Sequence, residues 1–188
     1  MEIAKIAESN KNYFYEKFQF ILLVENPLCL LNLLEIVKKK LLNFICIAFG
    51  SHDYTDIMEM QHIPKNLSYP RYHIINIAKA YNLLSIDIAS TNLTDEVDFE
   101  NECLEAFSMG FHGKFILHPM QLKVINNAKY YSDEEIKETI GVYNIINNMI
   151  DEDFSIIKYN GKIFEKPHLK RTYKIISWNN NRNIFPDN

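Results

Sequence analysis

Two acidic residues follow two short apolar segments at matching places in the sequence. Glu25 comes directly after residues 18–24, and Asp53 follows residues 44–49 after a short turn. Apolar runs of this length are typical of strands buried on both faces of a parallel sheet. In such a sheet both carboxylates emerge at the same edge, on neighbouring strands about 4.8 Å apart, which is close enough for the pair to share one cation.

Magnesium is the cation that such a pair would suit. It keeps several waters and binds through one or two carboxylates, which leaves positions for a bidentate substrate such as an enolate or an α-keto acid. The alternative interpretation is that Glu25 is a negative charge before a helix start and Asp53 is a turn residue beside Gly50. On spacing alone, this alternative is favoured.

The segments that position these residues alternate between strands and helices. An asparagine cap and Pro27 start the helix after Glu25, and Ser132 with Glu135 forms a capping box for a later helix. This alternation indicates a parallel sheet with helical crossovers, but periodicity alone does not choose between a (β/α) barrel and a doubly wound fold. The sequence predicts strands over 18–24, 44–49, 84–88 and 114–117, and helices over 2–17, 28–42, 68–81, 96–109, 118–127 and 132–151.

The alternation stops before the last part of the chain. Asn160-Gly161 stands between two short apolar segments, which predicts a β-hairpin over residues 156–164, and Pro167 starts a last helix to about residue 177. We therefore divide the chain into residues 1–152, which contain the strand and helix units, and a hairpin and helix extension over residues 153–188.

Composition excludes several classes of protein. The net charge is −4 and the 20 basic residues are scattered, so a nucleic-acid partner is not expected. The longest apolar runs fall far short of a membrane span and the first ten residues do not resemble a leader, so we expect no membrane association and a cytoplasmic location. The three cysteines stand singly in apolar patterns and are expected in the core.

Two further groups of polar residues were considered for chemistry. His52, His112 and His118 share no metal-ligand spacing, so they do not predict a zinc site. The segment from Ser90 to Asn92 follows the third predicted strand, where it would lie near a substrate, but a polar loop leading to a helix cap is the favoured interpretation.

Five segments of the chain together resemble one known family. In order, they are residues 22–27 (LLVENP), 48–55 (AFGSHDYT), 68–71 (SYPR), 85–91 (SIDIAST) and 110–121 (GFHGKFILHPMQ). They resemble the motifs of the citrate lyase beta subunit and HpcH/HpaI aldolase family, over nearly the entire chain. The glutamate and aspartate of the family's magnesium site fall on Glu25 and Asp53.

The resemblance also implies a fold. Members of the family are (β/α) barrels of TIM type, and the four predicted strands match the fifth to the eighth strands of that barrel. The chain is thus expected to be a half barrel of about four strand and helix units followed by the hairpin and helix. The other half supplies an arginine that grips the substrate and much of the acyl-CoA pocket in relatives.

Residues 161–165 (GKIFE) resemble a further motif of the family. In relatives that cleave or make acyl-CoA thioesters, an aspartate at the end of this motif comes from a neighbouring subunit and takes part in acid–base chemistry. The resemblance makes Glu165 the candidate catalytic residue, although glutamate carries its carboxylate one methylene further out. A negative charge at a helix start beside Pro167 is an equally good interpretation.

The function implied by the resemblance is a magnesium-dependent carbon–carbon lyase. Its substrate would be a β-hydroxy acyl-CoA or a keto acid, cleaved through a metal-stabilised enolate. The alternative is a catalytically impaired remnant, or a subunit of a split barrel that binds metal or a partner without turnover. Because open strand edges invite pairing, we expect either a homo-oligomer or a separately encoded N-terminal half barrel as partner.

Overall fold

A computed structural model describes residues 18–148 and 156–182 of the chain. The chain forms two compact units, Met1–Ala128 and Lys129–Asn188. This boundary precedes the one drawn from the sequence after residue 152, because the helix over residues 133–147 packs with the hairpin and the last helix. The helix predicted over residues 2–17 lies outside the described residues.

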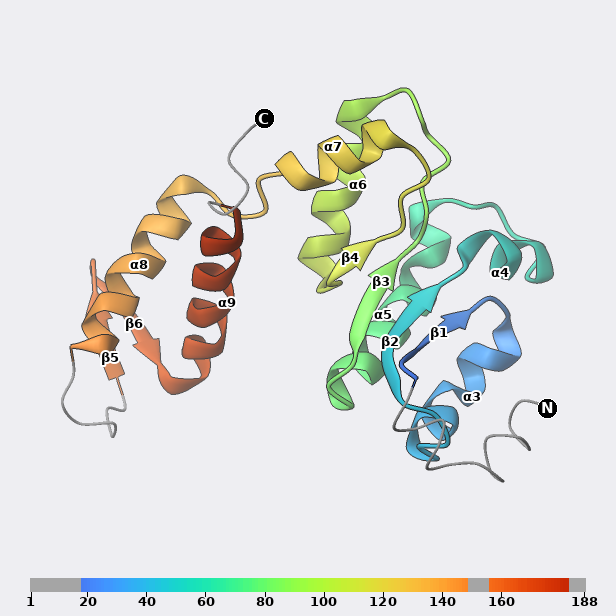
Figure 1. Ribbon diagram of the computed structural model, residues 1–188, viewed down its shortest axis with the longest axis horizontal. Coiled ribbons are helices and arrows are strands. Elements are labelled where there is room, and N and C mark those ends of the chain that lie inside the picture. Colours follow the sequence, from blue (N-terminus) through green and yellow to red (C-terminus); the bar gives the residue numbers. More distant parts are fainter. Residues whose placement is uncertain (1–17, 149–155, 183–188) are drawn as a thin grey trace. The chain divides into compact units, whose positions relative to one another are not determined.

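The first unit is built on a four-stranded sheet in the order β1-β2-β3-β4, with all pairs parallel (Figure 1). This confirms the predicted parallel α/β fold. Its elements are β1 (Phe20–Val24), α3 (Pro27–Lys38), β2 (Phe44–Phe49), α4 (Ser51–Ile57), α5 (Pro64–Ala80), β3 (Leu84–Asp87), α6 (Glu96–Met109), β4 (Gly113–Lys114) and α7 (Pro119–Asn127).

One face of the sheet carries the hydrophobic core. Side chains alternate along each strand, and Val24, Ile47 and Phe49 point from β1 and β2 toward the same side. There they pack in one cluster with side chains of α3, α5 and α6, including Leu33, Ile74 and Ala106. Within the part of the first unit that the structure describes, these helices thus share a single face of the sheet.

Local sequence signals explain where the helices start and stop. The side chain of Asn26 caps α3 by accepting a hydrogen bond from the backbone of Cys29 at 2.7 Å, and Pro27 occupies the first turn. Asp95 caps α6 in the same way, through the backbone of Asp98. At the end of α6, Gly110 takes a φ of 108°, the left-handed conformation that favours glycine.

Several predicted boundaries were wrong, including the end of the helix predicted over residues 28–42, which stops at Lys38. The turn predicted at residues 50–53 is the start of α4, a short helix that follows β2 directly. The next helix begins at Pro64, not at residue 68, because Pro64 is the proline of its first turn and Pro70 lies inside the helix. The fourth strand covers only Gly113–Lys114, whereas residues 115–117 continue without ladder pairing.

The second unit contains α8 (Asp133–Asn147), the antiparallel strands β5 (Ile156–Tyr159) and β6 (Lys162–Glu165), and α9 (Lys166–Arg182). The predicted cap is confirmed, since Ser132 accepts a hydrogen bond from the backbone of Glu135 at 3.1 Å. The hairpin turn is also confirmed, with positive φ at Asn160 and Gly161. Gly141 of α8 leaves the space that the ring of Tyr159 fills, so the hairpin lies close against α8.

The three cysteines differ in burial, since Cys46 and Cys103 are buried and Cys29 is half-buried. All three cysteines are free thiols, and burial raises the pKa of the Cys103 thiol to about 11. No helix in the described ranges has the length and apolarity needed to cross a membrane.

Candidate metal centre

Glu25 lies at the carboxyl end of β1, held against the end of β2. The N–H of Gly50 donates to the carbonyl of Val24 at 2.9 Å, which brings residue 50 directly beside residue 25. A Cβ atom at position 50 would stand 2.6 Å from Cγ of Glu25 and 3.1 Å from its Oε1. Gly50 is therefore needed for space and not for backbone freedom, because its φ is −89°. Because glycine has no side chain, the half-buried side chain of Glu25 lies directly against the backbone of residue 50. We call this space at Gly50 the cradle.

Asp53 lies on the neighbouring element, in the first turn of α4. Its side chain is exposed, and its place near a helix start favours a negative charge. Because α4 follows β2 without a loop, Asp53 is only three residues from the glycine that cradles Glu25. The structure thus places both predicted carboxylates at the carboxyl edge of two adjacent strands.

Neither carboxylate is neutralised by a protein cation. Within residues 18–148 and 156–182, no hydrogen bond or ion pair joins the side chain of Glu25 or Asp53 to another residue. The same residues contain no group of three or more histidine, cysteine, aspartate or glutamate side chains arranged for a metal ion. Two oxygen ligands with room for water fit magnesium, which rarely takes an all-protein ligand set.

Two histidine rings stack at the start of α4, where His52 is the residue before Asp53. The rings of His52 and His62 stack in parallel with centroids 4.2 Å apart, and the hydroxyl of Ser51 shares a hydrogen bond of 2.8 Å with Nε2 of His62. Partial burial lowers the pKa of His62, and the neighbouring His52 lowers it further, so the neutral imidazole is favoured. The sequence drew attention to His52 but not to His62, which reaches this edge from the loop before α5.

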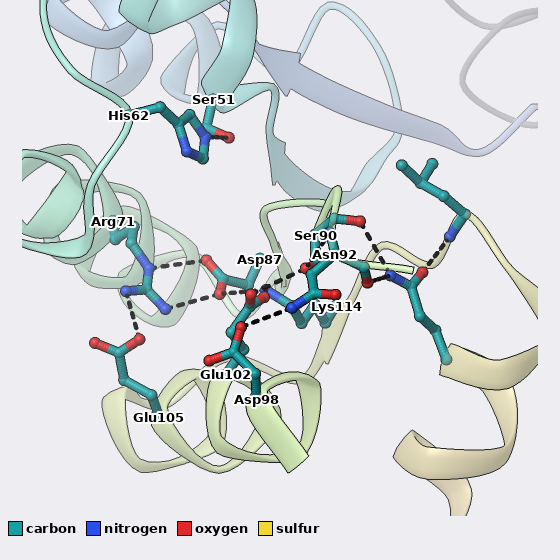
Figure 2. A network of polar contacts seen from close by, with 12 residues as sticks. Ser51, His62, Arg71, Asp87, Ser90, Asn92, Asp98, Glu102, Glu105 and Lys114 are labelled. Carbon is teal, nitrogen blue, oxygen red and sulfur yellow. Dashed lines mark hydrogen bonds and ion pairs between the residues drawn. The ribbon is translucent and has the colours of Figure 1, made fainter. Parts of the chain in front are cut away.

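The second half of the same edge holds a network of charges that the sequence did not predict (Figure 2). Asp87, the last residue of β3, is fully buried and accepts two hydrogen bonds from Arg71 of α5, from Nε at 3.0 Å and from Nη2 at 2.8 Å. Nζ of Lys114 lies 3.7 Å from the same carboxylate and 3.0 Å from Oε2 of Glu102. Glu105 completes the network, 3.2 Å from Arg71.

Charge pairing favours the charged form of Arg71. Burial acts to lower the pKa of Arg71, but the hydrogen bonds and charge of Asp87 outweigh it and raise that pKa. The contact between Lys114 and Oε2 of Glu102 is ionic, because it lacks the angles of a hydrogen bond. Arg71 and Asp87 interrupt otherwise apolar positions of a buried helix and a buried strand, and that interruption was the available signal in the sequence.

Gln121 ties together the two segments that leave β3 and β4. Its fully buried side chain donates to the carbonyls of Ser90 and Asn92 at 3.0 and 2.9 Å, and accepts from the N–H of Leu117 at 2.7 Å. Ser90 in turn donates to Glu102. These contacts favour the loop-forming role of Ser90 and Asn92 over a substrate-binding one. His118 is likewise a cap, accepting from the backbone of Met120.

Glu165 lies in the other compact unit. It is exposed, ends β6 and pairs with Ile156 across the hairpin. The structure therefore places the candidate catalytic residue on a different body from Glu25 and Asp53, and its role stays a prediction.

Comparisons with known proteins identify the family. The sequence model of the HpcH/HpaI aldolase/citrate lyase family matches residues 3–119. The chain is 28% identical over 155 residues to the citrate lyase subunit beta of Leuconostoc mesenteroides subsp. cremoris, covering 81% of this chain and 51% of that protein. It is 26% identical over 191 residues to human mitochondrial citramalyl-CoA lyase, covering 88% of this chain and 55% of that protein. The chain thus spans about half the length of these relatives.

Solved structures agree in fold. A crystal structure of the protein CitE from Mycobacterium tuberculosis in complex with magnesium, acetoacetate and coenzyme A matches with a TM-score of 0.71 at 18% identity, over 86% of this chain and 61% of that chain. A citrate lyase from Burkholderia xenovorans LB400 matches with a TM-score of 0.67 at 18% identity, over 84% of this chain and 51% of that chain. The residues of this chain that match the family model include both Glu25 and Asp53. The chain belongs to the HpcH/HpaI aldolase/citrate lyase family.

Proposed function

We propose that this chain is the metal-binding half of a magnesium-dependent carbon–carbon lyase with a TIM-type barrel, acting on a β-hydroxy acyl-CoA or a keto acid. Glu25 and Asp53 are the proposed metal ligands. The observation that carries the proposal is the cradle at Gly50, which keeps the Glu25 carboxylate at the strand edge next to Asp53. Membership of a family of lyases, and the magnesium in the CitE complex, support it.

Three acidic residues of this chain have distinct proposed roles. Glu25 at the end of β1 and Asp53 in the first turn of α4, which follows β2, would supply two negative oxygen ligands. A bound magnesium ion would supply positive charge to stabilise the enolate left when the carbon–carbon bond breaks. Glu165 of another copy is proposed to transfer a proton at the reacting carbon.

The proposed partners follow from the family and from the open sheet. The CitE complex contains coenzyme A and acetoacetate, and another structure of this type is complexed with oxaloacetate and magnesium. A coenzyme A thioester or a keto acid is therefore the substrate class to test. The barrel would be completed by a second copy or by a separately encoded N-terminal half, and a cytoplasmic location remains part of the proposal.

A second candidate function is metal or partner binding without turnover. One observation favours it: the acidic residue at the end of the proposed catalytic motif is Glu165, where the motif that it resembles has aspartate. A carboxylate misplaced by about 1 Å can reduce a rate on the order of a hundredfold. Glu165→Asp separates the two functions, since restored or increased cleavage would show that the glutamate limits turnover.

Magnesium binding by calorimetry tests the proposal. We expect saturable binding by the full chain, weakened by about tenfold or more in Glu25→Gln and in Asp53→Asn, because either change removes one of two charged ligands. Asp56→Asn is the matched control, an exposed aspartate one turn further along α4. Folded protein without saturable binding, or equal weakening in Asp56→Asn, would contradict the proposed site. Cleavage of citramalyl-CoA is then assayed with the same variants.

A further inference from the structure

The sheet of the first unit has a second face, which is also apolar. Ile21, Cys46 and Leu84 lie opposite one another across β1, β2 and β3, and the next row toward the carboxyl edge is Leu23, Ala48 and Ile86. Because side chains alternate along a strand, both rows point away from the core that packs with α3, α5 and α6. Neither row contains a charged residue.

The taller side chains of these rows are open to solvent. Ile21 is 53% exposed, Leu84 is 49% exposed and Leu23 is 40% exposed, whereas the small Cys46 and Ala48 between them are buried. Parallel sheets are normally covered on both faces, and contiguous exposed apolar side chains mark a surface that another element covers. We call this surface, defined by the six residues of the two rows, the open face.

The two edges of the sheet indicate what kind of element fits the open face. β1 forms one edge and β4 the other, and all four strands run in the same direction. In two copies related by a twofold axis along the strands, β1 of each copy meets β4 of the other in parallel. Eight parallel strands are the number at which a closed barrel is just filled by its inward side chains. Apolar rows without charge suit such an interior.

We propose that the open face is the interface for a second copy of this chain, with the two four-stranded sheets facing each other around a shared apolar interior. The number of strands agrees, because two copies of the four-stranded sheet supply the eight strands of a closed barrel. Since β4 has only two residues, most of the contact comes from the open face and little from edge pairing.

This inference deepens the proposed function, because the edges that carry Glu25 and Asp53 in both copies then surround one end of the barrel. Its test, however, does not depend on metal. The mass of the full chain is measured by analytical ultracentrifugation in buffer containing a chelator, over a range of concentrations. Ile21→Glu and Leu84→Glu introduce a charge at the two ends of one row of the open face. Leu31→Glu is the matched control, because Leu31 is 72% exposed on α3.

The expected result is a dimer whose dissociation constant rises at least about a hundredfold in both open-face variants, since an unpaired buried charge is strongly unfavourable. Leu31→Glu should leave the dimer unchanged. A monomer at all concentrations, a larger assembly, or a dimer that resists both open-face variants would overturn the proposal, and the last two results would point to another occupant. Circular dichroism checks folding, and Ile21→Thr and Leu84→Thr replace any glutamate variant that does not fold.

The two proposals fail in different ways. A chelator-resistant dimer that does not bind magnesium keeps the open face as an interface and removes the metal site. A monomer that binds magnesium through Glu25 and Asp53 keeps the metal site and removes the dimer interface. A different chain would then have to cover the open face.

Discussion

The carboxyl edge of one sheet carries two sets of acidic residues with opposite surroundings. At β3 and β4, Asp87 is buried between the cations Arg71 and Lys114. At β1 and β2, Glu25 and Asp53 have no cationic partner among the described residues. The difference indicates that Asp87 and its two cations stabilise the fold, and that Glu25 and Asp53 are available to bind a cation from solution. We call these the structural set and the free set.

The largest expected effect comes from breaking the structural set. Asp87→Asn leaves Arg71 and Lys114 buried without their shared counter-charge, and we expect it to lower the free energy of unfolding by about 3–5 kcal/mol. Urea denaturation measures this change. Glu35→Gln is the control, since its pair with Lys38 is exposed to solvent and contributes little to stability. Similar values for the two variants would remove the distinction between a structural and a free set.

The stabilising effect of magnesium tests the free set, Glu25 and Asp53. At a magnesium concentration about a hundred times its dissociation constant, binding to the folded state alone adds about 2.7 kcal/mol to the free energy of unfolding. We expect this stabilisation in the natural protein and its loss in Glu25→Gln and Asp53→Asn. Thermal and urea denaturation with and without magnesium measure it. A Glu25→Gln protein that magnesium still stabilises fully would place the ion elsewhere.

A smaller change tests how Glu25 is held. In Gly50→Ala the new methyl group requires the Glu25 side chain to leave its cradle, at a cost of about 1–3 kcal/mol in stability, and magnesium affinity should fall with it. In a Glu25→Ala background the same substitution should have a much smaller effect on stability. A double-mutant cycle gives the coupling between the two positions, and additive effects would mean that the cradle is not what glycine provides there.

The smallest effect concerns His62, whose pKa is lowered by burial and by the neighbouring His52. Its pKa is lowered in the folded state, so the folded protein binds fewer protons than the unfolded chain. Stability from this source is present above the ordinary histidine pKa of about 6.5 and is lost as pH falls through the lower folded value. The drop in stability from pH 7 to pH 5 should therefore be smaller in His62→Gln, while His73→Gln should keep the natural profile.

The sequence predicted the parallel sheet, the place of Glu25 and Asp53 at its edge and the hairpin at Asn160. These features depend on local signals, namely apolar runs and turn residues, which tertiary contacts did not override. It did not predict α4, because seven residues with a glycine before them and no side-chain cap give little local signal. The network around Asp87 was also missed, because a buried ion pair joins residues 16 positions apart and leaves no periodic pattern.

The side chain of Gln121 has a consequence for how this edge can vary. One amide holds the carbonyls of residues 90 and 92 and the N–H of residue 117 at fixed distances, so the two connections have coupled lengths. An inserted or deleted residue between β3 and position 92, or between β4 and position 117, would move one of these backbone groups out of reach of the Gln121 side chain. Loop-length change is therefore expected beyond residue 92, where the chain approaches the cap of α6 and Gln121 makes no contact.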